Sequence, residues 1–268
     1  MKELESFFEK EKIEYFASLP YSLCRETAPE IMARESFLPK SVVLFLIPYY
    51  TEVGVNISRY AVSRDYHLCI ADVSSRLIKM LSQRFPEAHF RAYGDHSPLD
   101  ERQAAISAGL GILGDNGLLI NEKYGTFVFI ADVVTDIPPE ELGAKTEPEP
   151  HLLCRHCGAC KKACPTGILS GEGSECLSFI TQKKGELTED ESALMKKYNT
   201  AWGCDECQSA CPYNKNAKIT PVPFFHEQRI EKLTGEILSS MSKEEFKSRA
   251  FAWRGRKTVE RNLKILEK

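Results

Sequence analysis

Eight of the ten cysteines lie at short, repeated intervals in one part of the chain. The first run has the spacing C-x2-C-x2-C-x3-C-P and the second has C-x2-C-x3-C-P, with one further cysteine between them. The eight are Cys154, Cys157, Cys160, Cys164, Cys176, Cys204, Cys207 and Cys211. Thiolates at this spacing can bind neighbouring irons of a cubane, so the pattern predicts two [4Fe–4S] clusters and a role in electron transfer.

The two clusters are expected to take ligands from both runs, because the cysteine before the proline usually binds the other cluster. One predicted ligand set is Cys154, Cys157, Cys160 and Cys211. The other set is Cys164, Cys176, Cys204 and Cys207. This crossing predicts that both runs belong to one folded unit.

Zinc sites and disulfides are the alternatives for these cysteines. C-x2-C pairs also bind zinc, but three closely spaced cysteines, a fourth before proline and a second run are awkward for a tetrahedral site. Disulfides need an oxidising compartment, and the chain shows no charged-then-apolar leader with a cleavage site. We therefore expect thiolate ligands in a reducing cytoplasm. Cys24 and Cys69 lack metal-ligand spacing and are expected to be small buried apolar residues.

The 268 residues have the composition of an ordinary globular protein, with 43% hydrophobic residues, 27% charged residues and a formal net charge of -3. The chain is longer than two clusters require, so we expect another domain beside them. Its longest apolar run, residues 41–47, falls short of the ~20 residues that span a bilayer, and no membrane association is expected. Residues 247–268 are basic, which fits either a solvated helix face or a surface that contacts phosphates.

The first part of the chain alternates strand and helix patterns. Apolar and β-branched stretches predict three strands, over residues 41–48, 88–93 and 126–135. Helical spacing predicts two helices, over residues 64–85 and 98–108. The second helix is expected to have Ser97 as its N-cap and Pro98 as its first residue. These elements predict an α/β or α+β domain over residues 1–145.

The remainder is expected to form a cluster module and a helical end. Residues 137–150 are rich in proline and glutamate and are expected to link the two parts. The cluster module is expected over residues 146–225, with a helix near 189–198. Helical spacing then returns, which predicts a basic helical segment over residues 226–268.

Three segments of the first part carry candidate site residues. Asp95 follows a predicted strand and has no capping role, so its carboxyl group can point into a cleft. The G-x-G-x-x-G at residues 109–114 follows a helix, which makes it a weak dinucleotide fingerprint. Its glycines permit close backbone approach to a cofactor or within a tight turn, and both remain open. Residues 58–67 are polar and aromatic, which fits a helix start or a binding segment.

Together these segments resemble the epoxyqueuosine reductase family, in order and over nearly the whole chain. The matching segments are Arg59-Tyr-Ala61, Arg64-Asp-Tyr-His67, residues 95–102, Ala108-Gly-Leu-Gly111 with Gly114-x-Asn116, the two cysteine runs and Cys176-Leu-Ser-Phe-Ile-Thr181. The resemblance implies an α+β fold: a corrinoid-binding α/β domain resembling that of reductive dehalogenases, a ferredoxin-like module with two [4Fe–4S] clusters, and a short helical C-terminus. It also implies a cobalamin-dependent reductase that removes the epoxide oxygen from epoxyqueuosine at the wobble position of tRNA.

The resemblance assigns roles to individual residues. Asp95 occupies the position of the family's proton donor, and a carboxyl that is protonated near neutral pH needs a pKa raised by a water-poor pocket. The expected cobalamin contacts lie just before and at the start of the first long helix, in the glycine-rich loop and just after Cys176. They are Ser58, Arg59, Tyr60, Arg64, Tyr66, His67, Gly111, Asn116, Leu119, Ser178 and Thr181.

The resemblance also concerns partners. Many members of the family continue beyond the basic segment into a helical-repeat domain that helps to hold tRNA, and this chain stops at Lys268. Contacts to tRNA phosphates are therefore expected from the basic segment, at Arg254, Arg256, Lys257 and Arg261. A low-potential donor such as ferredoxin or flavodoxin is expected to supply electrons to a cytoplasmic monomer.

Three other functions compete with this one. An electron-transfer protein that reductively activates a corrinoid on a partner would keep the clusters but would not need Asp95 or the basic segment. A reductive dehalogenase-like enzyme would need a small apolar substrate cavity and usually an export signal. A plain ferredoxin subunit would leave the first 140 residues without a role.

Overall fold

The computed structural model of the protein describes residues 2–145, 147–150, 153–173 and 175–267, which form two compact units. The first unit comprises Met1–Pro48 and His67–His156, and the second comprises Tyr49–Tyr66 and Cys157–Lys268. Residues 49–66 therefore group with the cysteine-rich part, although they precede it by about a hundred residues in the sequence. The division at residues 145 and 225 stays a prediction from the sequence.

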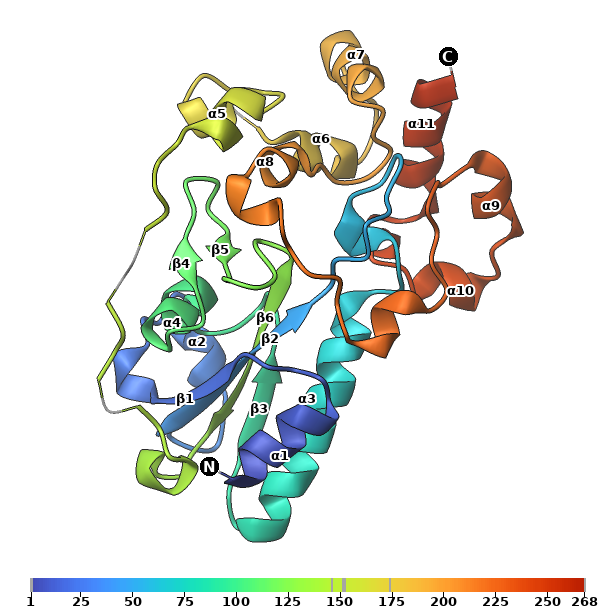
Figure 1. Cartoon of the computed structure of the whole chain (residues 1–268). Helices are drawn as coiled ribbons and strands as arrows, with labels where there is room; N and C mark the ends of the chain where they lie inside the picture. Colours follow the sequence, from blue (N-terminus) through green and yellow to red (C-terminus); the bar gives the residue numbers. More distant parts are fainter. Residues whose placement is uncertain (1, 146, 151–152, 174, 268) are drawn as a thin grey trace. The chain divides into compact units, whose positions relative to one another are not determined.

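A four-stranded antiparallel sheet forms the centre of the first unit (Figure 1). Its order is β1 (Phe16–Pro20), β2 (Ser41–Pro48), β6 (Val128–Thr135) and β3 (Phe90–Tyr93). The strand predicted at 41–48 has the bounds of β2, and the other two predicted strands begin two residues later than expected. Because every pairing in this sheet is antiparallel, the unit is α+β.

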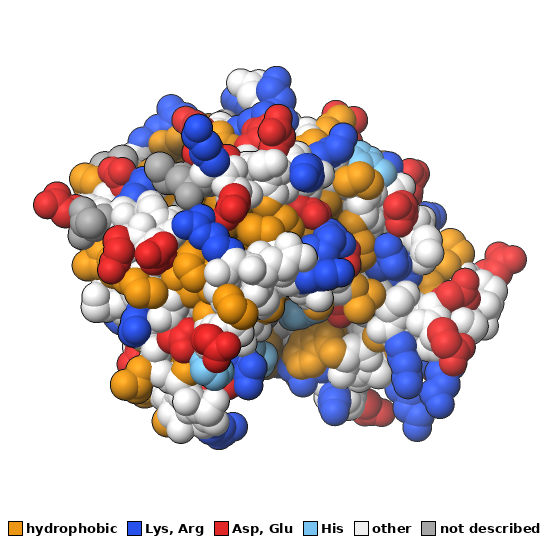
Figure 2. Space-filling model, turned by 90° about the horizontal axis from the view of Figure 1, so that it is seen from below, with side chains coloured by type: hydrophobic (Ala, Val, Ile, Leu, Met, Phe, Trp, Pro, Cys, Tyr) orange, Lys and Arg blue, Asp and Glu red, His pale blue; other side chains and the backbone are white. Residues whose placement is uncertain are grey.

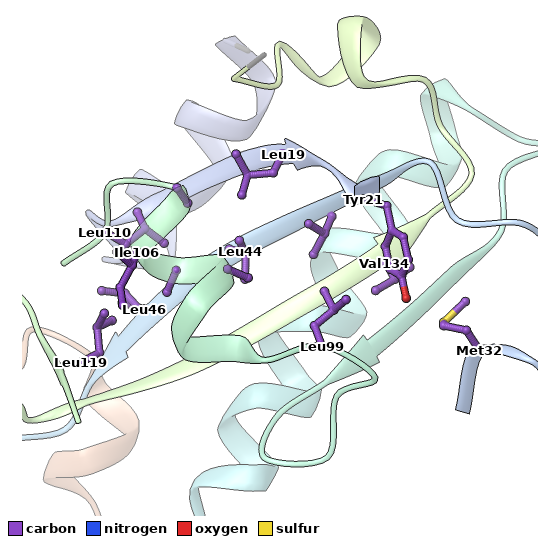
Figure 3. Packing of buried hydrophobic residues seen from close by; sticks show 14 of the residues in the cluster. Leu19, Tyr21, Met32, Leu44, Leu46, Leu99, Ile106, Leu110, Leu119 and Val134 are labelled. Carbon is purple, nitrogen blue, oxygen red and sulfur yellow. The ribbon is translucent and has the colours of Figure 1, made fainter. Parts of the chain in front are cut away.

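Helices cover both faces of this sheet, which explains why all of β2 is buried. On one face Leu44 and Leu46 pack in a cluster with Ile106 of α4 (Glu101–Ser107), as Figure 3 shows. On the other face Phe45 contacts Phe8 of α1 (Lys2–Lys10), with 5.3 Å between ring centroids. Helix α3 (Tyr66–Arg84) lies beside α1, and Arg84 pairs with Glu3 at 2.9 Å. Alternate residues of one strand thus bind two layers together.

The start of α4 corrects the capping prediction. Its N-cap is Asp100, whose side chain accepts a hydrogen bond from the Gln103 amide at 3.1 Å. Ser97 instead accepts from the Leu99 amide at 3.2 Å. The carbonyl of Pro98 accepts from two amides of an earlier loop, those of residues 27 and 28, so it is not available to begin the helix. The predicted cap at Ser97 was therefore wrong by one helical turn.

Two short strands and one short helix complete the first unit. They are β4 (Ile112–Leu113), β5 (Leu119–Ile120) and α2 (Pro29–Met32). β4 and β5 pair as an antiparallel hairpin that contains the glycine-rich segment. Among the described residues, none of the helices is both long enough and apolar enough to cross a lipid bilayer.

The second unit consists of short helices and loops. Its helices are α5 (Ala159–Ala163), α6 (Leu177–Gln182), α7 (Glu189–Lys197), α8 (Glu206–Ser209), α9 (Gly235–Ser240), α10 (Lys243–Lys247) and α11 (Arg256–Glu267). The helical segment predicted over residues 226–268 contains three helices, separated in part because Gly255 has a φ of 85° ahead of α11. The buried Asn262 of α11 donates to the carbonyls of Thr181 and Ala201 at 2.6 and 2.8 Å. These bonds fix α11 to α6 and to the loop that precedes the second cysteine run.

Candidate functional site

Seven of the eight predicted cluster ligands belong to the second unit, and several of their thiols lie close together. Helix α5 carries Cys160 and α8 carries Cys207. Burial, then the thiols of Cys176 and Cys207, raises the pKa of Cys204 to about 12. Burial, three neighbouring thiols and the Asp205 carboxylate raise the pKa of Cys207 to about 12. The three thiols are those of Cys176, Cys160 and Cys164. Gathered thiols that resist ionisation without a cation are a donor set that suits a metal cluster.

Cys154 belongs to the first unit, where its amide donates to the Leu113 carbonyl at 2.9 Å. Its thiol, a carboxylate oxygen of Asp115 and a ring nitrogen of His156 all lie within 4.8 Å of one another. The Nδ1 atom of His156 is 2.6 Å from Asp115 Oδ1. Two further potential donors therefore accompany this predicted cluster ligand.

Asp205 connects the predicted cobalamin segment to the second cysteine run. Its carboxylate accepts hydrogen bonds from the Ser58 hydroxyl, from the Arg59 amide at 2.7 Å and from the Arg59 guanidinium at 3.2 Å. Residues of both segments line a small cavity of about 130 Å³. Sequence analysis did not identify Asp205, and the available signal was an acidic residue between the ligands Cys204 and Cys207.

Other predicted cobalamin contacts have hydrogen-bond partners within the second unit. The Tyr60 hydroxyl accepts from Trp202 Nε1 at 2.8 Å. The Thr181 hydroxyl donates to the Ser178 carbonyl at 2.7 Å and accepts from the Gly203 amide at 2.9 Å. These contacts give the residues structural roles, and their contacts to cobalamin stay predictions.

Arg64 and Tyr66 also have partners within the second unit. Arg64 pairs with Glu227 at 3.1 Å, and its guanidinium lies 4.4 Å from the centroid of the Phe224 ring. The ring of the buried Tyr66 packs edge-on against Tyr60, with 6.2 Å between centroids. Residues 58–66 of the polar segment are thus held by contacts within the second unit.

The glycine-rich hairpin is explained by its own packing. A side chain at Gly111 would place its Cβ 2.6 Å from the Ile120 carbonyl oxygen, and one at Gly114 would collide with the Asn116 side chain. Leu119 is buried in the sheet cluster of Figure 3. The Nδ2 atom of Asn116, however, is buried and has no hydrogen-bond partner among the described residues. That amide is a donor available to a bound ligand.

Asp95 and His67 lie together in the first unit. Asp95 follows β3 and Gly94, its side chain is half exposed, and its Oδ2 is 3.8 Å from His67 Nε2. A mainly apolar groove of about 520 Å³ between α3 and β3 is lined by residues that include His67, Gly94 and His96. The hydroxyl of Ser74 in this groove is buried and has no partner in the described part of the chain. The structure therefore places the predicted proton donor beside a groove.

Two acids near Asp95, the buried Asp132 and the partly buried Glu101, were not identified from the sequence. Burial raises the pKa of Asp132 to about 7, and Ser97 partly offsets this rise. Burial, then Asp132 and Asp95, raises the pKa of Glu101 to about 8. Glu101 Oε1 accepts a hydrogen bond from the Asp95 amide at 3.0 Å. An acidic residue inside the apolar strand 126–135 was the signal for Asp132.

Two of the four predicted tRNA contacts in the basic segment are hydrogen-bonded to backbone carbonyls of the protein. The Arg256 guanidinium donates to the carbonyls of Leu238 and Met241, and the Arg261 guanidinium donates to those of residues 183 and 185. Lys257 is exposed, and Arg254 stacks on the exposed Trp253, with its guanidinium carbon 3.8 Å from the ring centroid. Figure 2 shows basic and acidic side chains interspersed over the face drawn there.

Two protein families match parts of the chain. Residues 153–214 match the family described as "4Fe-4S double cluster binding domain". Residues 36–96 match the family described as "Epoxyqueuosine reductase QueG, DUF1730". The first match contains all eight cysteines of the two runs and confirms the prediction of two [4Fe–4S] clusters.

Curated relatives extend this similarity along the chain. The epoxyqueuosine reductase of Listeria monocytogenes is 30% identical over an aligned length of 284 residues, gaps included. The alignment covers 98% of this chain and 72% of the relative. That of Cyclobacterium marinum is 31% identical, over 85% of this chain and 76% of its own length. That of Escherichia coli is 32% identical, over 78% of this chain and 55% of its own length.

Solved structures confirm the predicted fold. The epoxyqueuosine reductase of Streptococcus thermophilus has a TM-score of 0.77 and 23% identity, over 99% of this chain and 80% of that one. An epoxyqueuosine reductase solved with an epoxyqueuosine-modified stem loop of tyrosine tRNA has a TM-score of 0.79, with the same identity and coverage. Since relatives at least 30% identical match most of their length, the chain belongs to the epoxyqueuosine reductase family.

Proposed function

We propose that the protein reduces epoxyqueuosine to queuosine at the wobble position of tRNA, using two [4Fe–4S] clusters and cobalamin. The observation that carries this proposal is the match to an epoxyqueuosine reductase over 98% of the chain, which includes both the cysteine runs and the loop of Asp95. Loss of the epoxide oxygen as water consumes two electrons and two protons and leaves a carbon–carbon double bond. The protein must therefore supply both electrons and protons to one substrate.

The two units supply these in different ways. The cysteines of the two runs hold the clusters, which pass electrons singly. When bound, cobalamin would supply the low-potential chemistry that breaks the carbon–oxygen bond. The residues expected to hold it include those of the polar segment 58–66 in the second unit. Asp95 donates a proton to the departing oxygen, as general acids do in comparable reactions.

Fewer residues are proposed to contact tRNA phosphates than the sequence predicts. Arg256 and Arg261 already donate to backbone carbonyls, so we assign the phosphate contacts to Arg254 and Lys257. A tRNA substrate and reduced clusters both suit the cytoplasm, where a low-potential electron donor such as ferredoxin or flavodoxin is expected.

The proposed activity is tested by anaerobic reconstitution with iron, sulfide and cobalamin, followed by reaction with epoxyqueuosine-containing tRNA and a low-potential reductant. Nucleoside mass spectrometry is expected to show queuosine, and omission of cobalamin is expected to prevent its formation. Cys207→Ser should abolish conversion, whereas the matched variant Cys24→Ser, at a cysteine outside the runs, should retain it. If clusters and cobalamin bind fully but no queuosine forms, the alternative of corrinoid activation for a partner is favoured.

A further inference from the structure

The backbone at Asp95 has an unusual conformation that something must stabilise. Its φ is 67°, in the left-handed region that residues other than glycine seldom adopt. The loop leaves the sheet at Tyr93, passes through Gly94 and turns so that the Asp95 carboxyl is half exposed beside His67. A turn back to the ordinary β region would point this carboxyl elsewhere. The position of the proposed proton donor thus depends on what fixes this one residue.

Glu101 makes the hydrogen bond that fixes it. Its Oε1 atom accepts the Asp95 amide at 3.0 Å, across six residues of chain. Glu101 is the first residue of α4, and the N-cap Asp100 beside it is held by the Gln103 amide and by an ion pair with Arg25. The rest of α4 packs its buried face into the sheet cluster. The Glu101 carboxyl is therefore carried by a rigid element, while the Asp95 loop is attached to it.

Asp132 lies below the same loop and affects the charge of Glu101. In the sheet it is the register partner of Tyr93, the last residue before the loop, and its carboxyl is fully buried. The acidic groups that act on Glu101 are Asp132 from β6, Asp95 from the loop and Asp100 from the helix start. Partial burial and neighbouring like charges oppose ionisation, so a neutral Glu101 carboxyl can accept the amide without adding charge beneath the donor.

We infer that Glu101 is a positioning residue for the proposed reaction: its carboxyl oxygen holds the Asp95 amide and so keeps the Asp95 carboxyl beside His67 at the groove. The inference rests on the proposed function for its chemical meaning. The contact itself is a property of the first unit alone. Glu101 touches no reacting atom and acts only through Asp95.

The contact is tested first without cofactor or substrate, by amide hydrogen exchange of the purified chain. Glu101→Ala is expected to speed exchange of the Asp95 amide by roughly 10-fold, because one hydrogen bond is lost. Glu101→Gln keeps an oxygen acceptor and is expected to restore slow exchange. Glu87→Ala, at an exposed glutamate of the same unit, should leave the Asp95 amide unchanged. Equal exchange in wild type and Glu101→Ala would overturn the inference, whatever the enzyme assay shows.

Kinetics then separate positioning from a general loss of structure. With epoxyqueuosine-containing tRNA, Glu101→Ala is expected to lower kcat roughly 10- to 100-fold with KM unchanged, since a misplaced acid affects chemistry and not binding. Glu101→Gln is expected to recover most of kcat. An equal loss in both variants, or a loss that follows a lower melting temperature, would assign Glu101 a structural role instead. If wild type is inactive, the proposed function fails while the exchange result still decides the contact.

Discussion

The sheet of the first unit and the cysteine segments of the second are stabilised by different means. All eight residues of β2 are buried, between helices on both faces. Among the described residues 157–173, by contrast, Cys160 is the only buried side chain, and residues 204–214 bury only Gln208 and Cys211. Burial of a large apolar side chain contributes roughly 1.5–3 kcal/mol, and the cysteine segments have almost none of this. Their order must come from the clusters that they bind.

The difference matches the division of chemical labour. The proposed proton donor needs a fixed direction, and the loop that carries it is held by a sheet and a helix packed on it. The cluster ligands need to surround an inorganic group, and short loops with few apolar contacts can close around it. Core packing therefore positions the acid, and metal ligation positions the electron carriers.

The largest expected effect follows from removing the clusters. Chelation of iron should increase amide exchange in residues 157–173 and 204–214 by roughly 100-fold or more, because ligation is their main source of order. The strands β2 and β6 should keep their protection. Reconstitution with iron and sulfide should reverse the change. If the cysteine segments stay protected without iron, the contrast between the two regions is wrong.

A smaller effect concerns pH and the buried acid of the sheet. Asp132 ionises near pH 4 when unfolded, and burial raises its folded pKa to about 7. Its contribution to stability is thus fully present below about pH 4 and is lost as the pH rises through about 7. Asp132 should contribute a loss of roughly 2–4 kcal/mol between pH 5 and pH 8, and Asp132→Asn should reduce the slope of stability against pH accordingly.

The slope is best followed by amide exchange in β2 and β6, since both tryptophans, Trp202 and Trp253, belong to the second unit. Asp72→Asn, at an exposed acid of α3, serves as the matched control and should retain the wild-type slope. The amide that replaces the Asp132 carboxyl costs the same free energy of burial at every pH. It therefore changes the stability equally at all pH values and leaves the slope of stability against pH unaffected. An unchanged slope in Asp132→Asn would show that another group is responsible.

The smallest expected effect is at the tRNA surface. Lys257→Ala should weaken tRNA binding by roughly 2- to 5-fold. It should also reduce the slope of log affinity against log salt concentration by about 0.7. Lys79→Ala, which removes an exposed charge from the first unit, should change neither. Arg261→Ala should instead destabilise the second unit, because its guanidinium donates to backbone carbonyls. An equal loss of affinity in the two lysine variants would contradict a specific contact at Lys257.

Short sequence patterns predicted those elements whose structure depends mainly on neighbouring residues. The apolar run at 41–48 had one possible environment, a strand buried on both faces, and β2 has those bounds. The cysteine spacing likewise predicted cluster binding, because the ligands of a cubane are largely set by short intervals. The cap of α4 was missed because the Pro98 carbonyl is bound by amides of a loop some seventy residues earlier.

The partners of the site residues could not be predicted, because they come from distant parts of the chain. Nothing near Glu101 in the sequence indicates that its carboxyl holds the Asp95 amide above Asp132. Ser58 and Asp205 are far apart in sequence, and only the fold brings them into contact. The sequence left open whether the glycine-rich segment forms a tight turn or approaches a cofactor. In the structure its glycines are required by the packing of a tight hairpin.

The central claim is that Asp95 supplies the proton while the clusters supply the electrons. Single-turnover conversion of epoxyqueuosine-containing tRNA by Asp95→Asn tests it most directly, with cluster content followed by electron paramagnetic resonance and cobalamin content by absorbance. The account predicts that queuosine formation slows roughly 10²- to 10⁴-fold while both cofactors stay bound and reducible. Conversion at the wild-type rate with intact cofactors would contradict it.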